Sequence, residues 1–216
     1  MIQTYPLHSL LKGSWFKLIC GASYQHLPAV RNLALAYSLA GADCIDVAAD
    51  AAVIAAAREG IRVAQELSKQ AELSITRKDY DCQTLSLSLK TESKNHSTPW
   101  LMVSINDGED PHFRKAKFDQ TQCPTNCAQP CVKVCPANAI NPSSVGVIND
   151  LCYGCGRCLP ICPEELITTR SHLSSISAIA SLIESTEIDG LEIHTQIGHY
   201  EDFKQVWGDL LSLIHI

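Results

Sequence analysis

Residues 152–163, "CYGCGRCLPICP", carry four cysteines separated by two, two and three residues, with Pro163 directly after the last. This spacing is the C-x₂-C-x₂-C-x₃-C-P run of bacterial ferredoxins. In that arrangement three closely spaced thiolates hold one [4Fe–4S] cluster, and the fourth thiolate reaches a neighbouring cluster. The stretch therefore predicts a ferredoxin-like α+β module, which needs a second cysteine run to complete it.

A second run lies at residues 123–140, "CPTNCAQPCVKVCPANAI", where three residues separate each cysteine from the next and Pro136 follows the last. From Cys131 to Ile140 this run aligns with the later one at a constant offset. Each of its first two gaps is one residue longer than the matching gap of the later run. The two runs are therefore repeats, and together they predict a module with two clusters.

The repeat also predicts which cysteines share a cluster, because the fourth cysteine of each run ligates the cluster of the other run. Both clusters are expected to be [4Fe–4S]. The longer gaps of the earlier run leave its loops more freedom, so its cluster is open to conversion to a [3Fe–4S] form or to oxidative loss. The first cluster is assigned Cys123, Cys127, Cys131 and Cys162, and the second Cys135, Cys152, Cys155 and Cys158.

Two structural zinc sites, each with four thiolates, are the alternative for these cysteines. The proline after each fourth cysteine and the crossed repeat favour iron–sulfur clusters, and a brown colour would separate the two. Lys133 and Arg157 lie inside the runs. They are either counter-charges that tune the cluster potential or solvated surface bases.

The rest of the chain alternates buried strands with amphipathic helices, which predicts parallel, right-handed βα units. Four such units are half of a TIM-like (β/α)₈ barrel, so we expect an α/β fold with a barrel-like sheet of about four parallel strands. A half barrel leaves strand edges unpaired, which favours a fragment of a longer protein over a small open sheet. The expected strands are 15–21, 43–49, 99–106 and 190–195, and the expected helices are 23–42, 50–70, 171–186 and 198–214.

Two segments interrupt this alternation. Residues 71–98 are mostly polar and are expected to form a loop with one exposed strand at "TLSLSLK" (84–90), in which Cys82 is a bystander thiol. The cysteine segment follows the third strand, so we expect it over the carboxyl ends of the strands. The expected domains are 13–106 for the first three βα units, 107–170 for the iron–sulfur module and 171–216 for a truncated continuation of the βα domain.

Several polar residues fall near expected strand ends, where barrel enzymes place catalytic groups. Each also has a structural explanation, since Asp50 is a good helix N-cap and Cys20 and Cys44 are ordinary buried thiols. His26 and His194 are equally typical of hydrogen-bonded core or surface histidines. No residue is therefore assigned as catalytic. The residues at strand ends are Cys20, Ser23, Asp46, Asp50, Asn106, Asp107 and His194.

Composition narrows the class of protein further. The 216 residues are 46% hydrophobic and 19% charged, which is ordinary for a globular domain. A net charge of −6 without a basic run argues against nucleic acid as a partner. We find neither a transmembrane segment nor a secretory signal, so a cytoplasmic location is expected and the cysteines are interpreted as metal ligands.

Two stretches, "GSWFKLICGASYQHLPAVRNLALAYSLAGADCIDVAADAAVIAAA" and "PWLMVSINDGEDPHFRKAKFDQTQCPTNCAQPCVKVCPANAI", resemble the light-dependent period protein (LdpA) family of cyanobacteria. The similarity covers most of residues 13–213, apart from the polar insertion. The resemblance implies an iron–sulfur protein that modulates the circadian clock, with clock input and core oscillator proteins as partners. Family members continue well past the end of this chain, which supports the fragment interpretation.

Two functions of different kind follow. In the first, the clusters sense redox state and signal it to partner proteins, so that the chain is not an enzyme. In the second, the clusters relay electrons from a donor to a flavin or substrate at the carboxyl ends of the strands, as an oxidoreductase does. Bound flavin or substrate-dependent cluster reoxidation would favour the second. The motifs and the resemblance favour the redox sensor.

Overall fold

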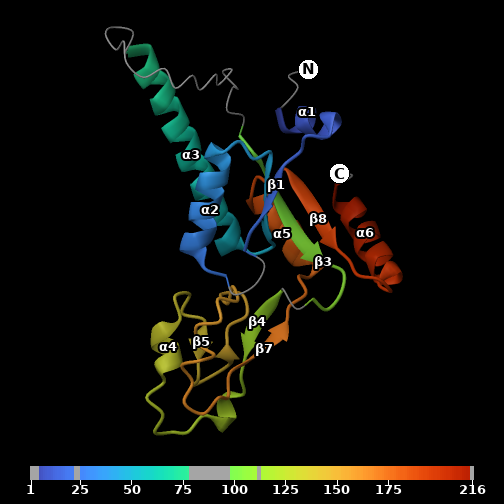
Figure 1. Cartoon of the computed structure of the whole chain (residues 1–216). Coiled ribbons are helices and arrows are strands. Elements are labelled where there is room, and N and C mark those ends of the chain that lie inside the picture. The colour runs from blue at the N-terminus through green and yellow to red at the C-terminus, as the bar shows by residue number, and fades with distance from the viewer. Residues whose placement is uncertain (1–4, 22–24, 78–97, 111–112, 215–216) are drawn as a thin grey trace.

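Among the described residues, four strands form one parallel sheet in the order β1, β2, β3, β8 (Figure 1). The structure is a computed structural model that describes residues 5–21, 25–77, 98–110 and 113–214. The predicted α/β fold with a four-stranded parallel sheet is confirmed. The strands are β1 (Lys17–Ile19), β2 (Cys44–Ala48), β3 (Trp100–Asn106) and β8 (Gly190–His194).

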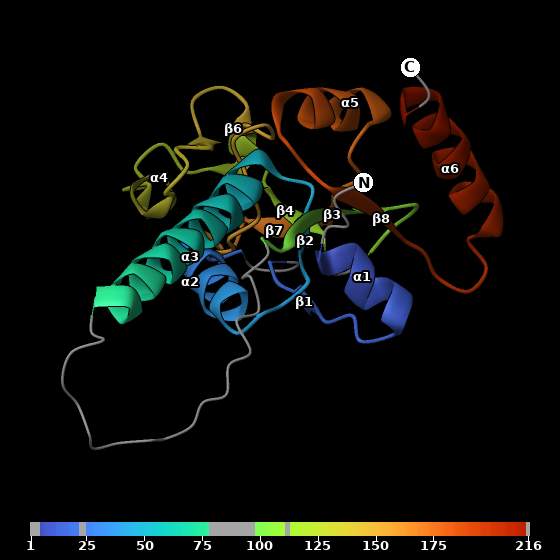
Figure 2. The same cartoon turned by 90° about the horizontal axis from the view of Figure 1, so that it is seen from above.

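One face of the sheet is apolar and carries the core. Ile45 and Val103 point to this face and pack against the helices that follow β1 and β2, while Ile105 and Ile193 pack against the two later helices. Figure 2 shows the helices around one side of the sheet. These helices are α2 (Leu27–Leu39), α3 (Ala51–Arg77), α5 (Ile176–Ser185) and α6 (Tyr200–Ile214).

Helices α2 and α3 approach closely at Gly60 of α3. A Cβ atom built on Gly60 would lie 2.3 Å from the Arg31 carbonyl oxygen and 2.9 Å from the Leu35 nitrogen, both in the backbone of α2. Neither backbone atom can move without distorting α2. Gly60 therefore sets the spacing of the two helices that cover the first half of the sheet.

The structure corrects four details of the sequence prediction. Helix α3 continues to Arg77, so the first part of the expected 71–98 loop is helical; the expected strand at 84–90 and Cys82 lie outside the described residues. The helix expected from residue 171 begins only at Ile176, after Ser175, whose hydroxyl accepts from the Ala178 N–H as its N-cap. Ser171 instead ends a strand, and residues 172–175 form neither helix nor strand. Helix α1 (Tyr5–Lys12) was not predicted.

The cysteine segment is enclosed by an antiparallel pair of strands, β4 (Arg114–Lys117) and β7 (Thr168–Ser171). It has a core of its own, in which Cys131, Cys152 and Cys158 pack with Ile140 and Ile167. Figure 1 shows this module beyond the end of the sheet to which β3 points. Its remaining elements are the 3₁₀ turn η1 (Gln120–Gln122), α4 (Pro130–Val134), β5 (Ile140–Asn141) and β6 (Gly146–Val147).

None of the helices in the described part of the chain combines the length and apolar character that crossing a membrane requires.

Candidate metal centres

Four cysteines from both runs line one cavity of the module. Cys152, Cys155 and Cys158 come from the later run, and Cys135 comes from the end of the earlier one. The cavity opens to solvent on one side. Most of its other walls are small or apolar, with Ala137 and Ala139 among them, and Arg157 adds a positive charge. The cavity thus brings together the four residues predicted to hold the second cluster.

The electrostatics of this cavity favour a bound cation. Burial, together with the charges of Cys155 and Cys152, raises the pKa of the Cys158 thiol to about 11. Burial likewise raises the pKa of Tyr153, which lines the cavity, to about 12. Four converging thiolates repel one another, and iron ions remove that repulsion because they bind the thiolate form. The donor set and the small-residue walls fit a [4Fe–4S] cluster.

The loop that carries Cys152 and Cys155 is held against β4. Gly154, between them, has φ +80°, and a Cβ atom built on it would lie 2.4 Å from the Arg114 carbonyl oxygen. Only glycine combines that backbone angle with such a close approach. Gly154 therefore fixes the loop on β4 and positions the two thiols beside the cavity.

The other predicted set is also brought together. The pKa of the Cys123 thiol is raised first by partial burial and then by Cys127, Cys131 and Cys162, which lie close enough for their charges to act on it. Only Cys131 of this set is buried; the other three are half-buried. The long loop passes through Gln129 at φ 51°, directly before α4. The same residues thus group as predicted, in a more open site.

Backbone N–H groups point at one thiol of each set. The Ala139 N–H donates to Cys135 Sγ at 3.2 Å, and the Gln129 N–H donates to Cys127 Sγ at 3.4 Å. Hydrogen bonds to cluster sulfurs are a main determinant of cluster potential. That the eight cysteines ligate iron remains a prediction, which their grouping supports.

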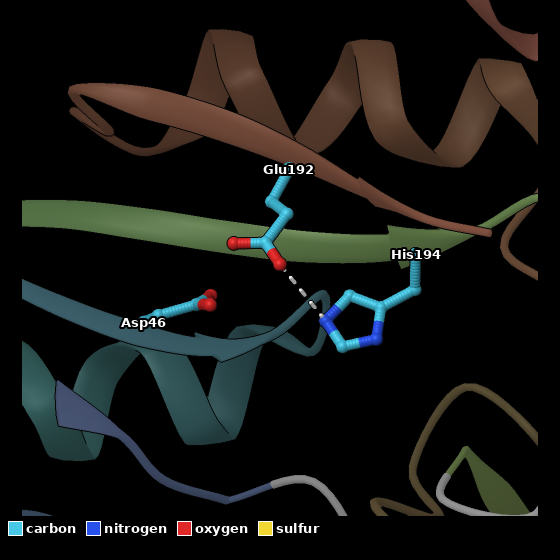
Figure 3. Close-up of side chains that lie close together, drawn as sticks. All are labelled: Asp46, Glu192 and His194. Atoms are coloured by element: carbon cyan, nitrogen blue, oxygen red, sulfur yellow. Dashed lines mark ion pairs between the residues drawn. The ribbon is translucent and has the colours of Figure 1, made fainter. Parts of the chain in front are cut away.

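A separate polar cluster lies on the open face of the sheet. Asp46 of β2 and Glu192 and His194 of β8 point toward one another, with His194 Nε2 3.3 Å from Glu192 Oε1 (Figure 3). Lys17 of β1 binds both carboxylates and is 3.0 Å from Asp46 Oδ2. The Ser104 hydroxyl of β3 donates to Asp46 Oδ1 at 2.6 Å. Every strand of the sheet thus contributes to this cluster.

Lys17 supplies the positive charge that the two carboxylates need. Burial opposes its charge, but the hydrogen bonds that it donates to Glu192 and Asp46 raise the pKa of Lys17 overall. Burial raises the pKa of Asp46, whereas the hydrogen bond and charge of Lys17 outweigh burial and lower the pKa of Glu192. The three donor groups, within 4.8 Å of one another, could also ligate a metal ion. Because Lys17 already pairs with both carboxylates, we interpret the group as a charge network.

The residues expected at strand ends have mostly structural roles. Asp46 lies inside β2, and not after it as the sequence suggested. The Asp50 carboxylate accepts from the Ala52 N–H at 3.0 Å, which confirms it as the N-cap of α3. Burial raises the pKa of the thiols of Cys20 to about 11 and Cys44 to about 12, so both stay protonated at neutral pH.

The remaining strand-end residues also have protein partners or lie elsewhere. The Asn106 amide donates to the Gly108 carbonyl oxygen at 2.7 Å, and Asp107 lies 3.3 Å from His199 Nδ1. His26 is exposed at the start of α2, and Ser23 lies outside the described residues. Sequence reasoning missed Lys17, Ser104 and Glu192; the available signal was their polarity within buried strands.

The domain families that match the chain define its class. Residues 123–173 match the LdpA Fe-S cluster-binding domain, and residues 182–215 match the Light dependent period A C-terminal domain. The chain therefore contains an iron–sulfur cluster-binding domain.

A similar protein identifies the family of the chain more closely. The chain is 47% identical over 210 residues to Light dependent period A of Synechococcus elongatus, a match that covers 97% of the chain and 52% of the relative. The chain is a homologue of Light dependent period A, and the predicted resemblance to that family is confirmed. It spans about half the length of this relative.

A second relative shares part of the chain. The arsenate respiratory reductase iron-sulfur subunit ArrB of Shewanella sp. is 34% identical over 96 residues, which are 40% of the chain and 39% of that subunit. No solved structure matches the chain.

Proposed function

We propose that the chain binds two [4Fe–4S] clusters and works in the cytoplasm as a redox-responsive modulator of circadian period. The observation that carries the proposal is the crossed grouping of cysteines. Cys135 joins the set of the later run, and Cys162 joins the set of the earlier run. Two-cluster ferredoxins share their ligands in this way, whereas two independent zinc sites have no need to.

The more open first site is the one proposed to respond to redox conditions. Its set has one buried cysteine, Cys131, where the second set has two, Cys152 and Cys158. Solvent access exposes a cluster to oxidants, and it is one of the factors that set the reduction potential of the cluster. We infer that the first cluster changes state, by electron transfer or by conversion to [3Fe–4S], while the second cluster is retained and holds the module together.

The proposed output is a change in partner binding. One electron changes the charge of a cluster that lies near the surface, which alters the electrostatic match with a partner protein. Homology to Light dependent period A supports clock input proteins and core oscillator proteins as those partners. A reduced electron carrier is the proposed donor. Affinity for such a partner should therefore differ between the reduced and oxidised protein.

We also propose that the sheet is a segment of a barrel-like βα domain. The sequential strand order and the helices on one face support this, because they leave the polar network on the face that a barrel would enclose. The proposed domains are 13–106, 107–170 and 171–216, with the module inserted between β3 and α5.

The second candidate is an oxidoreductase. It is favoured by a cavity between the module and the carboxyl end of the sheet, where α/β enzymes bind substrates. Bound flavin in the purified protein, or cluster reoxidation that depends on a substrate, would establish this candidate over the sensor.

The direct test is anaerobic purification with iron and acid-labile sulfide counts and EPR of the reduced protein. We expect about eight irons and eight sulfides per chain and two interacting paramagnetic clusters. Cys135→Ser should remove the second cluster, although the other three cysteines of the same run are assigned to the first cluster. Cys20→Ser, in a buried thiol of the sheet, is the matched control and should leave both clusters in place. Zinc in place of iron would refute the proposal.

A further inference from the structure

A second cavity lies where the sheet meets the cysteine module. Ser104 and Asn106, toward the carboxyl end of β3, line it from the sheet, and Phe113, Lys115 and His172 line it from the module. Its enclosed volume is about 30 Å³, and it opens to solvent. Ligands of α/β proteins favour this edge of a parallel sheet.

Positive charge predominates in this cavity. Arg114 and Lys115 line it, and Asp50 is the one acidic residue among its described lining residues. Lys115 Nζ donates to the Asn149 carbonyl oxygen at 3.0 Å and is 3.7 Å from Asp50 Oδ2. The cavity is thus locally basic in a chain whose net charge is −6. Such a site attracts anions selectively.

Both cations are held in place by the module. The Arg114 guanidinium donates to the Thr169 hydroxyl at 2.8 Å and to the Thr169 carbonyl oxygen at 3.0 Å. Its nearest carboxylate contact is Glu109, at 3.9 Å and exposed. Burial and the charge of Lys115 lower the pKa of His172, as expected in a basic environment. The positive groups are therefore preorganised for an external anion.

Uncharged polar groups complete the lining. Gln25 is 5% exposed, and its Oε1 has no hydrogen-bond partner within the described parts of the chain. Its Nε2 donates to the Gly21 carbonyl oxygen, so Oε1 is left as an acceptor. Ser104 and Asn106 add a hydroxyl and an amide. A ligand with a hydroxyl or N–H group beside its anionic group fits this combination.

Tyr153 lines this cavity and also the cavity of the second cysteine set. It is 9% exposed and follows Cys152 in the chain. A ligand in the basic cavity therefore lies one side chain away from the proposed second cluster. At that separation in a buried setting, charges on the two sides influence each other.

We propose that this cavity binds a small organic anion through its carboxylate or phosphate group, and that binding is coupled to the oxidation state of the second cluster across Tyr153. The coupling rests on the proposed function, since it needs a cluster at Cys135, Cys152, Cys155 and Cys158. Reduction adds a negative charge to the cluster, so the anion binds the oxidised form more tightly. By linkage, the bound anion lowers the reduction potential by the matching amount.

The test measures binding and potential on the anaerobically purified protein. Succinate and inorganic phosphate are the two probes, titrated separately by calorimetry, and the potential of each cluster is measured by EPR redox titration with and without the probe. We expect saturable binding of at least one probe and a lower potential for the second cluster. If the oxidised form binds about tenfold more tightly, the potential falls by about 59 mV at saturation.

Lys115→Met should weaken binding about tenfold, because it removes a charge-assisted contact. His172→Gln is the second variant and should weaken it less. Lys117→Met is the control, since Lys117 is exposed on the same strand and does not line the cavity. Cluster content of every variant is counted first, so that a loss of binding is not confused with a loss of the cluster.

Binding of phosphate alone identifies a phosphate-bearing ligand, and binding of succinate alone identifies a carboxylate. No saturable binding of either probe, or equal weakening by Lys115→Met and Lys117→Met, overturns the inference. Binding without any change of potential overturns the coupling. Absence of iron–sulfur clusters would instead refute the proposed function, while a Lys115-dependent anion site would still stand.

Discussion

The two cysteine sets are chemically alike but are supported differently by the fold. Around the second set, Gly154 fixes the loop on β4, and Cys152 and Cys158 are buried in the core of the module. Around the first set, longer gaps lead the chain through Gln129 in a left-handed conformation, and Cys131 is its one buried member. The difference teaches that added loop length changes how a cluster is protected without changing which thiols meet.

The largest expected effect separates the sets by substitution. Cys158→Ser should remove about four of about eight irons and destabilise the module, because Cys158 is part of its core. Cys123→Ser should also lower the iron count but leave the module folded, since Cys123 is half-buried. Iron analysis and thermal unfolding by circular dichroism measure both effects. Equal loss of stability in the two variants would show that the sets are equally supported.

A second prediction tests whether the sheet is stabilised independently of the clusters. Lys17→Met leaves the buried Asp46 and its neighbour Glu192 without their cation, and should lower the free energy of unfolding by about 3 kcal/mol. The matched control is Lys12→Met, in an exposed lysine, which should change it by less than about 0.5 kcal/mol. Denaturant unfolding provides the measurement. Iron retention should not differ between the two variants while they remain folded.

The smallest effect concerns how the second site is held. Gly154→Ala forces the loop away from the Arg114 carbonyl oxygen and should cost about 1–3 kcal/mol, with weaker retention of the second cluster. Gly41→Ala has a similar positive φ, but its Cβ atom would meet no atom within 4 Å. Gly41→Ala therefore measures the loss of stability that comes from the backbone angle alone. If both variants retain iron equally, the contact with β4 does not protect the second cluster.

Much of the fold could be predicted from local sequence. The four strands of the parallel sheet and the Asp50 cap follow from apolar runs and from residue preferences at helix ends. Strand β7 was not predicted because its pairing with β4 joins Lys117 to Thr168, a long-range contact that leaves no local pattern. Helix α3 extends beyond residue 70, where it was expected to end, because residues 71–77 are also compatible with a helix.

The candidate sites also differ in how far the sequence predicts them. The grouping of the cysteines could be expected because a repeat with known ligand exchange encodes it directly, and their ligation of iron stays a prediction. The polar network could not, since Lys17 and Glu192 are far apart in the sequence and meet only through the order of the strands. The basic cavity likewise needs the module placed over the end of β3. Contacts between distant segments depend on the fold and are not visible in composition or spacing.

The inequality of the two sites is tested most directly by timed exposure of the anaerobically purified protein to air. Iron content is counted and each cluster is followed by EPR and Mössbauer spectroscopy. We predict that the cluster of Cys123, Cys127, Cys131 and Cys162 converts to [3Fe–4S] or is lost first, while the cluster of Cys135, Cys152, Cys155 and Cys158 persists. Equal persistence of two [4Fe–4S] clusters, or earlier loss of the second, would contradict this account.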